Sequence, residues 1–195
     1  PNGADKGKEQ IVEINKARWS PAGPDTVFAL KRFWGGARQM FDIEASIHLR
    51  LHHPNIVQCL CAFSGGRSSS LLLEFMDKNL AQYIEARGTE NLTLAEQIHI
   101  MLEIAKGMEY LHSKGIIHRD LKPENVLIND HNHEIKLRTS LRRNLYGIQI
   151  KIADFNYSKR INDPKGTYTK HVGTSIFRAP EVMRGDEGTK YGTSV

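Results

Sequence analysis

The segment "GIIHRDLKPENVLI", residues 115–128, constrains the fold more than any other part of the sequence. Six polar or charged side chains fall within eight positions: His118, Arg119, Asp120, Lys122, Glu124 and Asn125. Apolar residues lie directly on both sides, at 116–117 and 126–128. An ordinary surface loop does not need apolar anchors so close on each side, because water solvates its polar groups. The pattern therefore predicts polar groups that are held rigidly at the floor of a cleft.

Composition sets the broad class of protein. The 195 residues suffice for one domain or a two-lobed unit with a sizeable core. Hydrophobic residues make up 39% and charged residues 25%, as in soluble globular proteins. No apolar run approaches the roughly 18 residues of a membrane helix, so no membrane segment is predicted. The net charge of +5 is mild, and we predict no nucleic-acid partner. The basic segment "KLRTSLRRN" favours a solvated loop over a phosphate or partner contact.

Cys59 and Cys61 are the only cysteines. Two residues apart in an expected strand, they would share one face, where a disulfide between them would be strained. We expect reduced thiols in an intracellular, cytoplasmic protein.

The first 76 residues are predicted to form a β-rich lobe. Two β-prone runs, 11–19 and 26–33, flank the turn "SPAGPD" and indicate a hairpin. Residues 37–51 have helical periodicity, and "HHPN" is expected to end that helix. Strands are predicted at 56–63 and 70–76, joined by the Gly/Ser loop "SGGRSSS".

The chain becomes helical after Met76. A short helix is predicted at 80–87 and a long one begins near Leu94, with Thr93 and Glu96 as a capping box and Gly115 just past its end. Its expected core stripe is Ile98, Met101, Leu102, Ala105, Met108 and Leu111. We predict an α+β bilobal fold, with a small antiparallel β-rich lobe at 1–76 and an incomplete helical large lobe at 77–195.

Two charged residues of the small lobe are expected to pair. Lys31 lies in the strand "VFALK" and Glu44 inside the following helix. A buried lysine is costly without an anionic partner, and a Lys31 paired with Glu44 is placed to reach anionic phosphates.

The remaining chemistry fits phosphoryl transfer. Asp154 ends the apolar strand in "IKIADFN", and with Asn125 it offers oxygen ligands of the kind that Mg²⁺ prefers. Asp120 is placed to accept a proton from an attacking hydroxyl, and Lys122 to neutralise a transferring phosphoryl group.

These motifs, in this order, resemble the protein kinase family. "HRDLKPEN" is similar to the catalytic loop, "VFALK" to the third strand, "DFN" to the metal-binding DFG and "VGTSIFRAPE" to the end of the activation segment. The resemblance spans nearly the whole chain. "KPEN" is typical of serine/threonine kinases, and "HLRLHHPNIVQ" and "EFMDKNL" look most like the tyrosine-kinase-like group.

The resemblance assigns roles to residues. It implies that Asp120 is the catalytic base, that Lys122 contacts the γ-phosphate and that Thr174 bonds to both. It further implies that Asn125 and Asp154 hold Mg²⁺, and that Lys31, paired with Glu44, binds the α- and β-phosphates. The implied adenine site consists of the gatekeeper Leu73, the hinge Glu74, Phe75 and Met76, and the flanking Ile14, Ala29 and Leu127. His118 and Phe155 are implied to be buried packing residues.

Several positions depart from the family pattern. Gly7, Glu9 and Val12 stand where the phosphate-binding loop has three glycines, so only Gly7 remains and weaker nucleotide binding is expected; alternatively, the true loop lies upstream of the first residue. Asn156 replaces the DFG glycine, where its tolerance of positive φ can keep the metal-binding aspartate in position. His48 stands where the family packs an apolar residue against Phe155.

The ends and loops carry further expectations. The chain starts at Pro1 and stops at "YGTSV", so it resembles a kinase domain truncated before the end of its large lobe. Thr167, Tyr168 and Thr169 are candidate phosphorylation sites in the activation segment, the alternative being an unmodified, solvated loop.

The predicted function is that of a fragment of an ATP- and Mg²⁺-dependent protein kinase, whose parent phosphorylates Ser or Thr hydroxyls of protein substrates; the fragment alone is expected to be inactive. The alternative is a pseudokinase, a non-catalytic interaction module that retains the bilobal shape.

Overall fold

The computed structural model describes residues 12–18, 26–130, 147–161 and 173–178, with 180 and 183. The strands of its first part are β1 (Val12–Arg18), β2 (Val27–Trp34), β3 (Cys59–Gly65) and β4 (Ser68–Glu74). Those of the second are β5 (Lys78–Asn79), β6 (Ile116–Ile117), β7 (Val126–Asp130), β8 (Ile148–Ile152) and β9 (Lys159–Arg160). The helices are α1 (Arg38–His48), α2 (Leu80–Arg87) and α3 (Leu94–Ser113).

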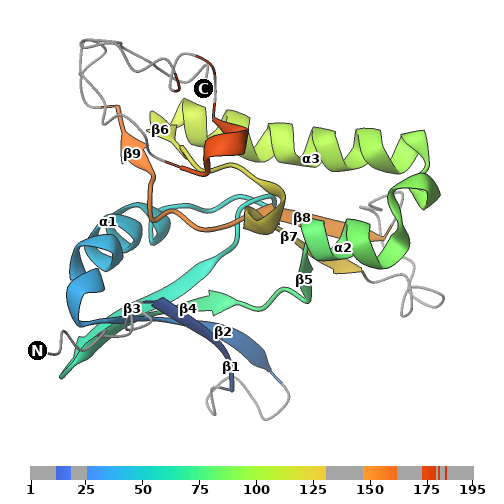
Figure 1. Cartoon of the computed structure of the whole chain (residues 1–195). Coiled ribbons are helices and arrows are strands. Elements are labelled where there is room, and N and C mark those ends of the chain that lie inside the picture. The colour runs from blue at the N-terminus through green and yellow to red at the C-terminus, as the bar shows by residue number, and fades with distance from the viewer. Residues whose placement is uncertain are drawn as a thin grey trace, which may run out of the picture.

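The first part is an antiparallel sheet in the order β1-β2-β4-β3, with α1 packed on one face (Figure 1). The predicted hairpin is present as β1 and β2. Residues 64, 65, 68 and 69, expected in a loop, are instead paired in β3 and β4. Gly66 and Arg67 suffice for the turn because Gly66 adopts a φ of 54°. The Ser64 and Ser69 hydroxyls bond at 2.9 Å across the strands.

Two local expectations were wrong. The first helix ends at His48, not at Leu51, because the chain tightens into a turn in which the Leu51 N–H donates to the His48 carbonyl; Leu51 is still buried. Cys59 and Cys61 do not share a face, because a bulge between them pairs Cys59 with Leu73 but Cys61 with Leu72. Both cysteines are free thiols.

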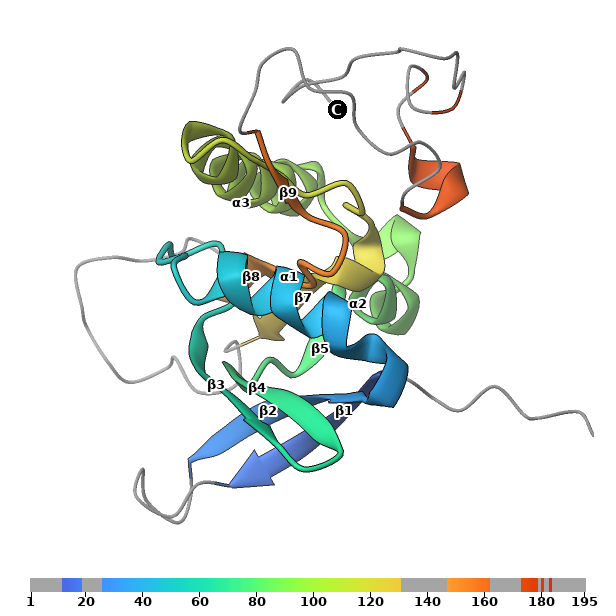
Figure 2. The ribbon, with the colours of Figure 1, turned by 90° about the vertical axis from the view of Figure 1, so that its left-hand side faces the viewer.

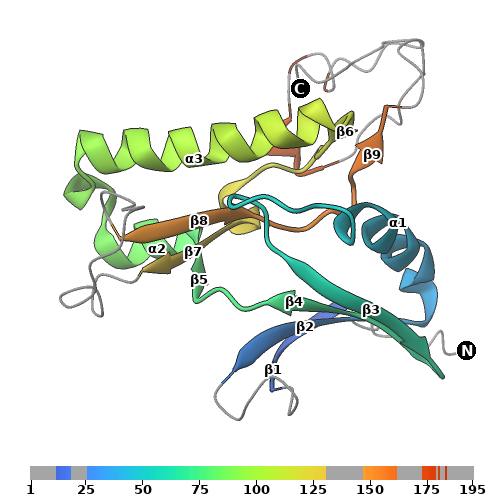
Figure 3. The ribbon, with the colours of Figure 1, turned by 180° about the vertical axis from the view of Figure 1, so that it is seen from behind.

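The second part contains the sheet β5-β7-β8, the ribbon β6-β9 and the long helix α3, which runs alongside β8 (Figure 3). The capping box of Thr93 and Glu96 is present, and Gly115 follows the helix with a φ of 65°. The predicted core stripe of α3 was only partly right. Leu111 is buried, but Ile98, Met101 and Leu102 are 51%, 59% and 50% exposed. The most deeply buried apolar positions of α3 are instead Ile100, Gly107 and Leu111.

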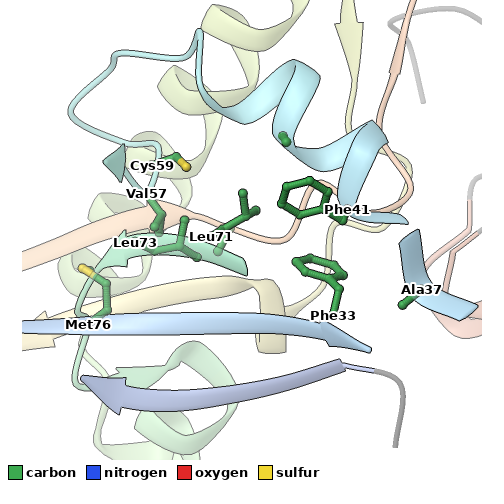
Figure 4. Close-up of a cluster of buried hydrophobic side chains, with 10 residues drawn as sticks. Phe33, Ala37, Phe41, Val57, Cys59, Leu71, Leu73 and Met76 are labelled. Carbon is green, nitrogen blue, oxygen red and sulfur yellow. The ribbon is translucent and has the colours of Figure 1, made fainter. Parts of the chain in front are cut away.

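The core consists of three apolar clusters. One lies between the four-stranded sheet and α1, where Phe33 and Phe41 meet edge to face at 5.6 Å between ring centroids (Figure 4). A second joins the two parts through Ile47, Leu51, Ile56, Leu111, Ile116, Ile152 and Phe155. The third fills the space between α2, α3, β7 and β8. Figure 2 shows α1 between the four-stranded sheet and α3, so this helix contributes to both parts.

The architecture is the predicted bilobal α+β fold. The predicted lobe boundary at residues 76 and 77 falls between β4, which ends at Glu74, and β5, which begins at Lys78. Within the described ranges, no helix has the length and apolar character to cross a membrane.

Candidate active site

Lys31 and Glu44 form a buried ion pair between β2 and α1. The Lys31 Nζ donates to the Glu44 Oε1 at 3.0 Å and to Oε2 at 2.7 Å, and the two side chains are 3% and 0% exposed. Strand pairing explains the position, because Lys31 lies opposite Ile14 and Leu71 on the sheet face that α1 covers. Burial alone would lower the pKa of Lys31, but the carboxylates of Glu44 and Asp154 raise it above its usual value. The site therefore holds a charged ammonium group.

Asp154 lies on the other side of the same ammonium. Its Oδ1 accepts from the Lys31 Nζ at 2.8 Å, and its side chain remains 31% exposed. It has a φ of 66°, which is unusual for a residue with a Cβ. The next polar side chain, Asn156, also reaches Lys31, with its Oδ1 at 3.2 Å from Nζ.

Asp120 is held by hydrogen bonds to both carboxylate oxygens. Oδ1 accepts from the Thr174 backbone N–H at 2.7 Å and from its hydroxyl at 2.8 Å. Oδ2 accepts from the Asn125 Nδ2 at 3.0 Å, and the Lys122 Nζ lies 3.1 Å away. Lys122 also donates to the Thr174 hydroxyl at 2.8 Å. The structure thus brings together four residues that are up to 54 positions apart.

The protonation state of Asp120 follows from these contacts. Burial alone would raise its pKa, but the hydrogen bonds from Thr174 and Lys122 lower the pKa below its usual value. Asp120 is therefore an ionised carboxylate in a fixed orientation, with a hydroxyl and an ammonium group beside it.

The apolar residues on both sides of the polar segment 118–125 are where the sequence predicted them. Ile116, Ile117, Val126 and Ile128 are all buried, in β6 and β7. Between them, Arg119 has a φ of 68°, and the Asn125 Nδ2 donates to the Asp120 main-chain carbonyl at 2.8 Å. The loop is held at both ends by buried apolar residues and in its middle by the hydrogen bond between Asn125 and Asp120.

Three rings pack together beneath this loop, with Phe155 tilted against His48 and edge to face with His118. Phe155 is fully buried, 4.6 Å from the His48 ring and 5.3 Å from the His118 ring, centroid to centroid. His48 bonds through Nε2 to the Val57 carbonyl at 2.6 Å, which satisfies this polar atom in the core. His118 bonds through Nε2 to the Ala153 carbonyl at 2.9 Å. Both predicted packing residues are thus buried, and His48 takes the place beside Phe155.

Comparison with known proteins identifies the family. Residues 25–195 match the protein kinase domain. The chain belongs to the protein kinase family. It is 33% identical to a "Light-sensor Protein kinase" of Ceratodon purpureus over 195 residues, covering 94% of this chain and 14% of that protein. It is 32% identical to "Cell division control protein 2 homolog 3" of Trypanosoma brucei brucei, covering 94% and 50%. It is 33% identical to "Serine/threonine/tyrosine-protein kinase HT1" of Arabidopsis thaliana, covering 75% and 33%. The chain therefore spans half or less of each of these relatives.

Most of the predicted adenine residues of this kinase domain lie together. Leu73 and Met76 belong to the cluster under α1, and Ala29 and Leu127 pack against it. Ile14 is 64% exposed.

The predicted hinge residue Glu74 forms an ion pair with β8. Its carboxylate accepts from the Lys151 Nζ at 2.6 and 2.8 Å. Gly7, Glu9, Thr167, Tyr168 and Thr169 lie outside the described residues.

Two expectations about replaced glycines need correction. Val12 stands where the phosphate-binding loop has glycine, but its side chain packs against the cluster that holds Phe33, its partner across β1 and β2. Asn156 was expected to exploit a positive φ; among the described residues other than glycine, only Arg119 and Asp154 have one. Its side chain instead acts through the contact with Lys31, which sequence reasoning missed.

The Glu74–Lys151 pair was also missed, although a signal existed. Lys151 stands inside the apolar strand "IQIKI", and a buried lysine requires an anionic partner.

Asn125 and Asp154 fit a magnesium site. The Asn125 Nδ2 is committed to Asp120, which leaves its amide Oδ1 as the ligand atom, and Asp154 has a second carboxylate oxygen beside the one on Lys31. Within the described ranges, no group of three or more His, Cys, Asp or Glu residues could hold a metal ion by itself. A site with few protein ligands suits Mg²⁺, which is usually bound by one or two carboxylates together with water and substrate phosphates.

Proposed function

We propose that the protein transfers the γ-phosphate of ATP to Ser or Thr hydroxyls of protein substrates. The observation that carries the proposal is the environment of Asp120, where the Thr174 hydroxyl lies 2.8 Å from both the carboxylate Oδ1 and the Lys122 Nζ. A hydroxyl between an ionised carboxylate and an ammonium group is the arrangement that a phosphoryl acceptor requires. Membership of the kinase family supports the same reaction.

Each residue has a role in this mechanism. Asp120 orients the attacking hydroxyl and accepts its proton. Lys122 neutralises charge on the phosphoryl group as it moves. Lys31, held by Glu44, binds the α- and β-phosphates. Asn125 and Asp154 would hold Mg²⁺, which neutralises phosphate charge when bound.

Partners and location belong to the same proposal. The partners are ATP and a protein substrate, with no nucleic acid. The free thiols of Cys59 and Cys61 support an intracellular, cytoplasmic location. Thr167, Tyr168 and Thr169 remain candidate phosphorylation sites.

A pseudokinase is the second candidate. Glu9 and Val12, in place of glycines, favour it. The packing of Val12 into the core weakens that argument, because its side chain is engaged by apolar neighbours. The complete set of Lys31, Glu44 and Asp154 contacts favours the enzyme.

The test is Asp120→Asn in the full-length protein, with Asp42→Asn as a matched control on the exposed surface of α1. Asp120→Asn should fold and bind ATP but transfer phosphate at least about 10²-fold more slowly, and the control should behave as wild type. Equal turnover in Asp120→Asn overturns the proposed role. Nucleotide binding by the wild type without any transfer identifies a pseudokinase.

A further inference from the structure

Asn156 stands where the family has glycine, and its side chain is in the middle of the active site. The residue is 9% exposed. Its Oδ1 lies 3.2 Å from the Lys31 Nζ, and its backbone N–H donates to the Asp154 Oδ1 at 3.4 Å. A glycine could make the second contact but not the first, because it has no side chain.

The contact matters because the donors of Lys31 are limited. An ammonium group has three N–H donors. Four oxygens surround this one: two from Glu44, one from Asp154 and one from Asn156. The Glu44 and Asp154 carboxylates supply two negative charges against one positive charge. The neutral amide of Asn156 adds an acceptor without adding a third negative charge.

The backbone beside Asn156 also needs support. Asp154 has a φ of 66°, a conformation that costs of order 1 kcal/mol for a residue with a Cβ. Such a conformation persists only where its surroundings hold it. Phe155 is held between the His48 and His118 rings, and Asn156 ties the following position to Lys31. A residue with a Cβ at 156 also leaves the segment fewer alternative conformations than glycine would.

We propose that Asn156 is a positioning residue: its side-chain amide holds Lys31 and the 154–156 segment in the nucleotide-binding arrangement before the nucleotide arrives. This inference rests on the proposed kinase function, because it assigns Lys31 to the phosphates and Asp154 to the metal.

The role follows from what changes on binding. Lys31 must turn an N–H toward a phosphate, and Asp154 must turn an oxygen away from Lys31. The Asn156 amide can keep its contact with Lys31 through this exchange, because its Oδ1 accepts from the Lys31 Nζ and carries no charge that draws it away. Asn156 therefore stabilises the state that binds nucleotide and leaves the chemical step unchanged.

Two variants separate the amide from the backbone effect. Asn156→Ala removes the amide and keeps Cβ; Asn156→Gly removes both. In the nucleotide-free protein, hydrogen exchange of the amides at 154–158 should be about threefold to tenfold faster in Asn156→Ala, the scale of one lost hydrogen bond. The Kd for ADP with Mg²⁺ and the KM for ATP should rise by a similar factor while kcat stays constant. Asn156→Gly should show larger changes in exchange and Kd.

Asn91→Ala is the matched control, because it removes the same amide group at an exposed site near the end of α2; it should leave all these values unchanged. Unchanged exchange and Kd in Asn156→Ala would overturn the proposal. So would tighter nucleotide binding, which would make Asn156 a competitor for Lys31, or a fall in kcat at constant KM. Exchange and binding do not require phosphate transfer. If the wild-type protein binds nucleotide but transfers no phosphate, the proposed kinase activity is refuted. The role of Asn156 is then still decided by the hydrogen-exchange and Kd measurements.

Discussion

Lys31 and Glu44 are almost completely buried, so each depends on the other for its charge. Their pairing could be predicted from sequence, because a lysine inside an apolar strand needs an anion and the next helix carries one. The contact between Asn156 and Lys31 could not be predicted, because the motif "DFN" does not indicate the direction of the asparagine side chain. The sequence pattern therefore predicts the charge balance of the site better than its hydrogen bonds.

Removal of Lys31 should expose this dependence. Lys31→Met leaves Glu44 charged and unpaired in the core, and we expect a loss of about 3 kcal/mol in the free energy of unfolding. The double variant Lys31→Met/Glu44→Leu should recover most of the lost free energy of unfolding, because an apolar pair replaces the buried charges. Urea unfolding measures both, and neither variant should bind ATP. A double variant as unstable as the single one would show that the cost does not come from the unpaired Glu44.

His118 gives the domain a pH dependence of its own. Its Nδ1 accepts from the Asp120 N–H at 3.3 Å while Nε2–H donates to the Ala153 carbonyl, so the ring is neutral. Burial lowers its pKa below the usual 6.5. Below pH 6.5 the histidine binds a proton in the unfolded chain but stays neutral in the folded protein. The free energy of unfolding therefore falls as the pH falls.

Stability should therefore decrease from about pH 7 to about pH 5.5, by at most about 1.4 kcal/mol per pH unit for one histidine. The pKa values of Glu44 and Asp120 are lowered from 4.5 and 3.8, so both carboxylates stay ionised in this window. His53 and His112, whose pKa values burial also lowers, contribute in the same direction. His118→Gln should reduce the pH dependence measured by urea unfolding without abolishing it. A slope identical to wild type would contradict a neutral, buried His118.

At the scale of elements, the ends of helices were easier to predict than their buried faces. The ends of α3 could be predicted from Thr93, Glu96 and Gly115, because capping is a local property of the chain. Its apolar stripe did not identify the buried face, because Ile98, Met101 and Leu102 are apolar and yet exposed. Which apolar side chains are covered depends on the neighbouring elements, and periodicity within one helix does not contain that information.

Gly107 shows what the buried face of α3 requires. A Cβ at this position would lie 2.8 Å from the Ile152 Cδ1 and 2.9 Å from the Asn55 carbonyl oxygen. We expect Gly107→Ala to lower the free energy of unfolding by about 1–3 kcal/mol, despite the better helix propensity of alanine. Gly36→Ala is the matched control, because a Cβ there meets nothing within 4 Å. Thermal melts would compare the two, and equal stability of both variants would contradict the close approach of α3 to β8.

Across the whole molecule, residues 55–57 join the two sheets. The Val57 N–H donates to the Ile152 carbonyl, and the Ile152 N–H donates to the Asn55 carbonyl, both at 2.9 Å. The Asn55 Nδ2 donates to the Glu103 carboxylate on α3 at 2.7 Å and to the Ile150 carbonyl at 3.0 Å. One asparagine thus links the segment after α1 to both α3 and β8. The bilobal shape could be predicted from the order of motifs, but this junction could not, because "HPN" has the composition of an ordinary turn.

The junction predicts that the two parts lose stability together. Asn55 is 3% exposed, and Asn55→Ala removes one hydrogen bond to a carboxylate and one to a buried carbonyl, at a cost of about 2–3 kcal/mol. Because both bonds cross between the parts, hydrogen-exchange protection should fall by the same free energy in β2 and in α3. Exposed Asn91→Ala should change neither by more than about 0.5 kcal/mol. Protection lost in α3 alone would show that the small lobe is stable without this junction, and that the two parts unfold independently.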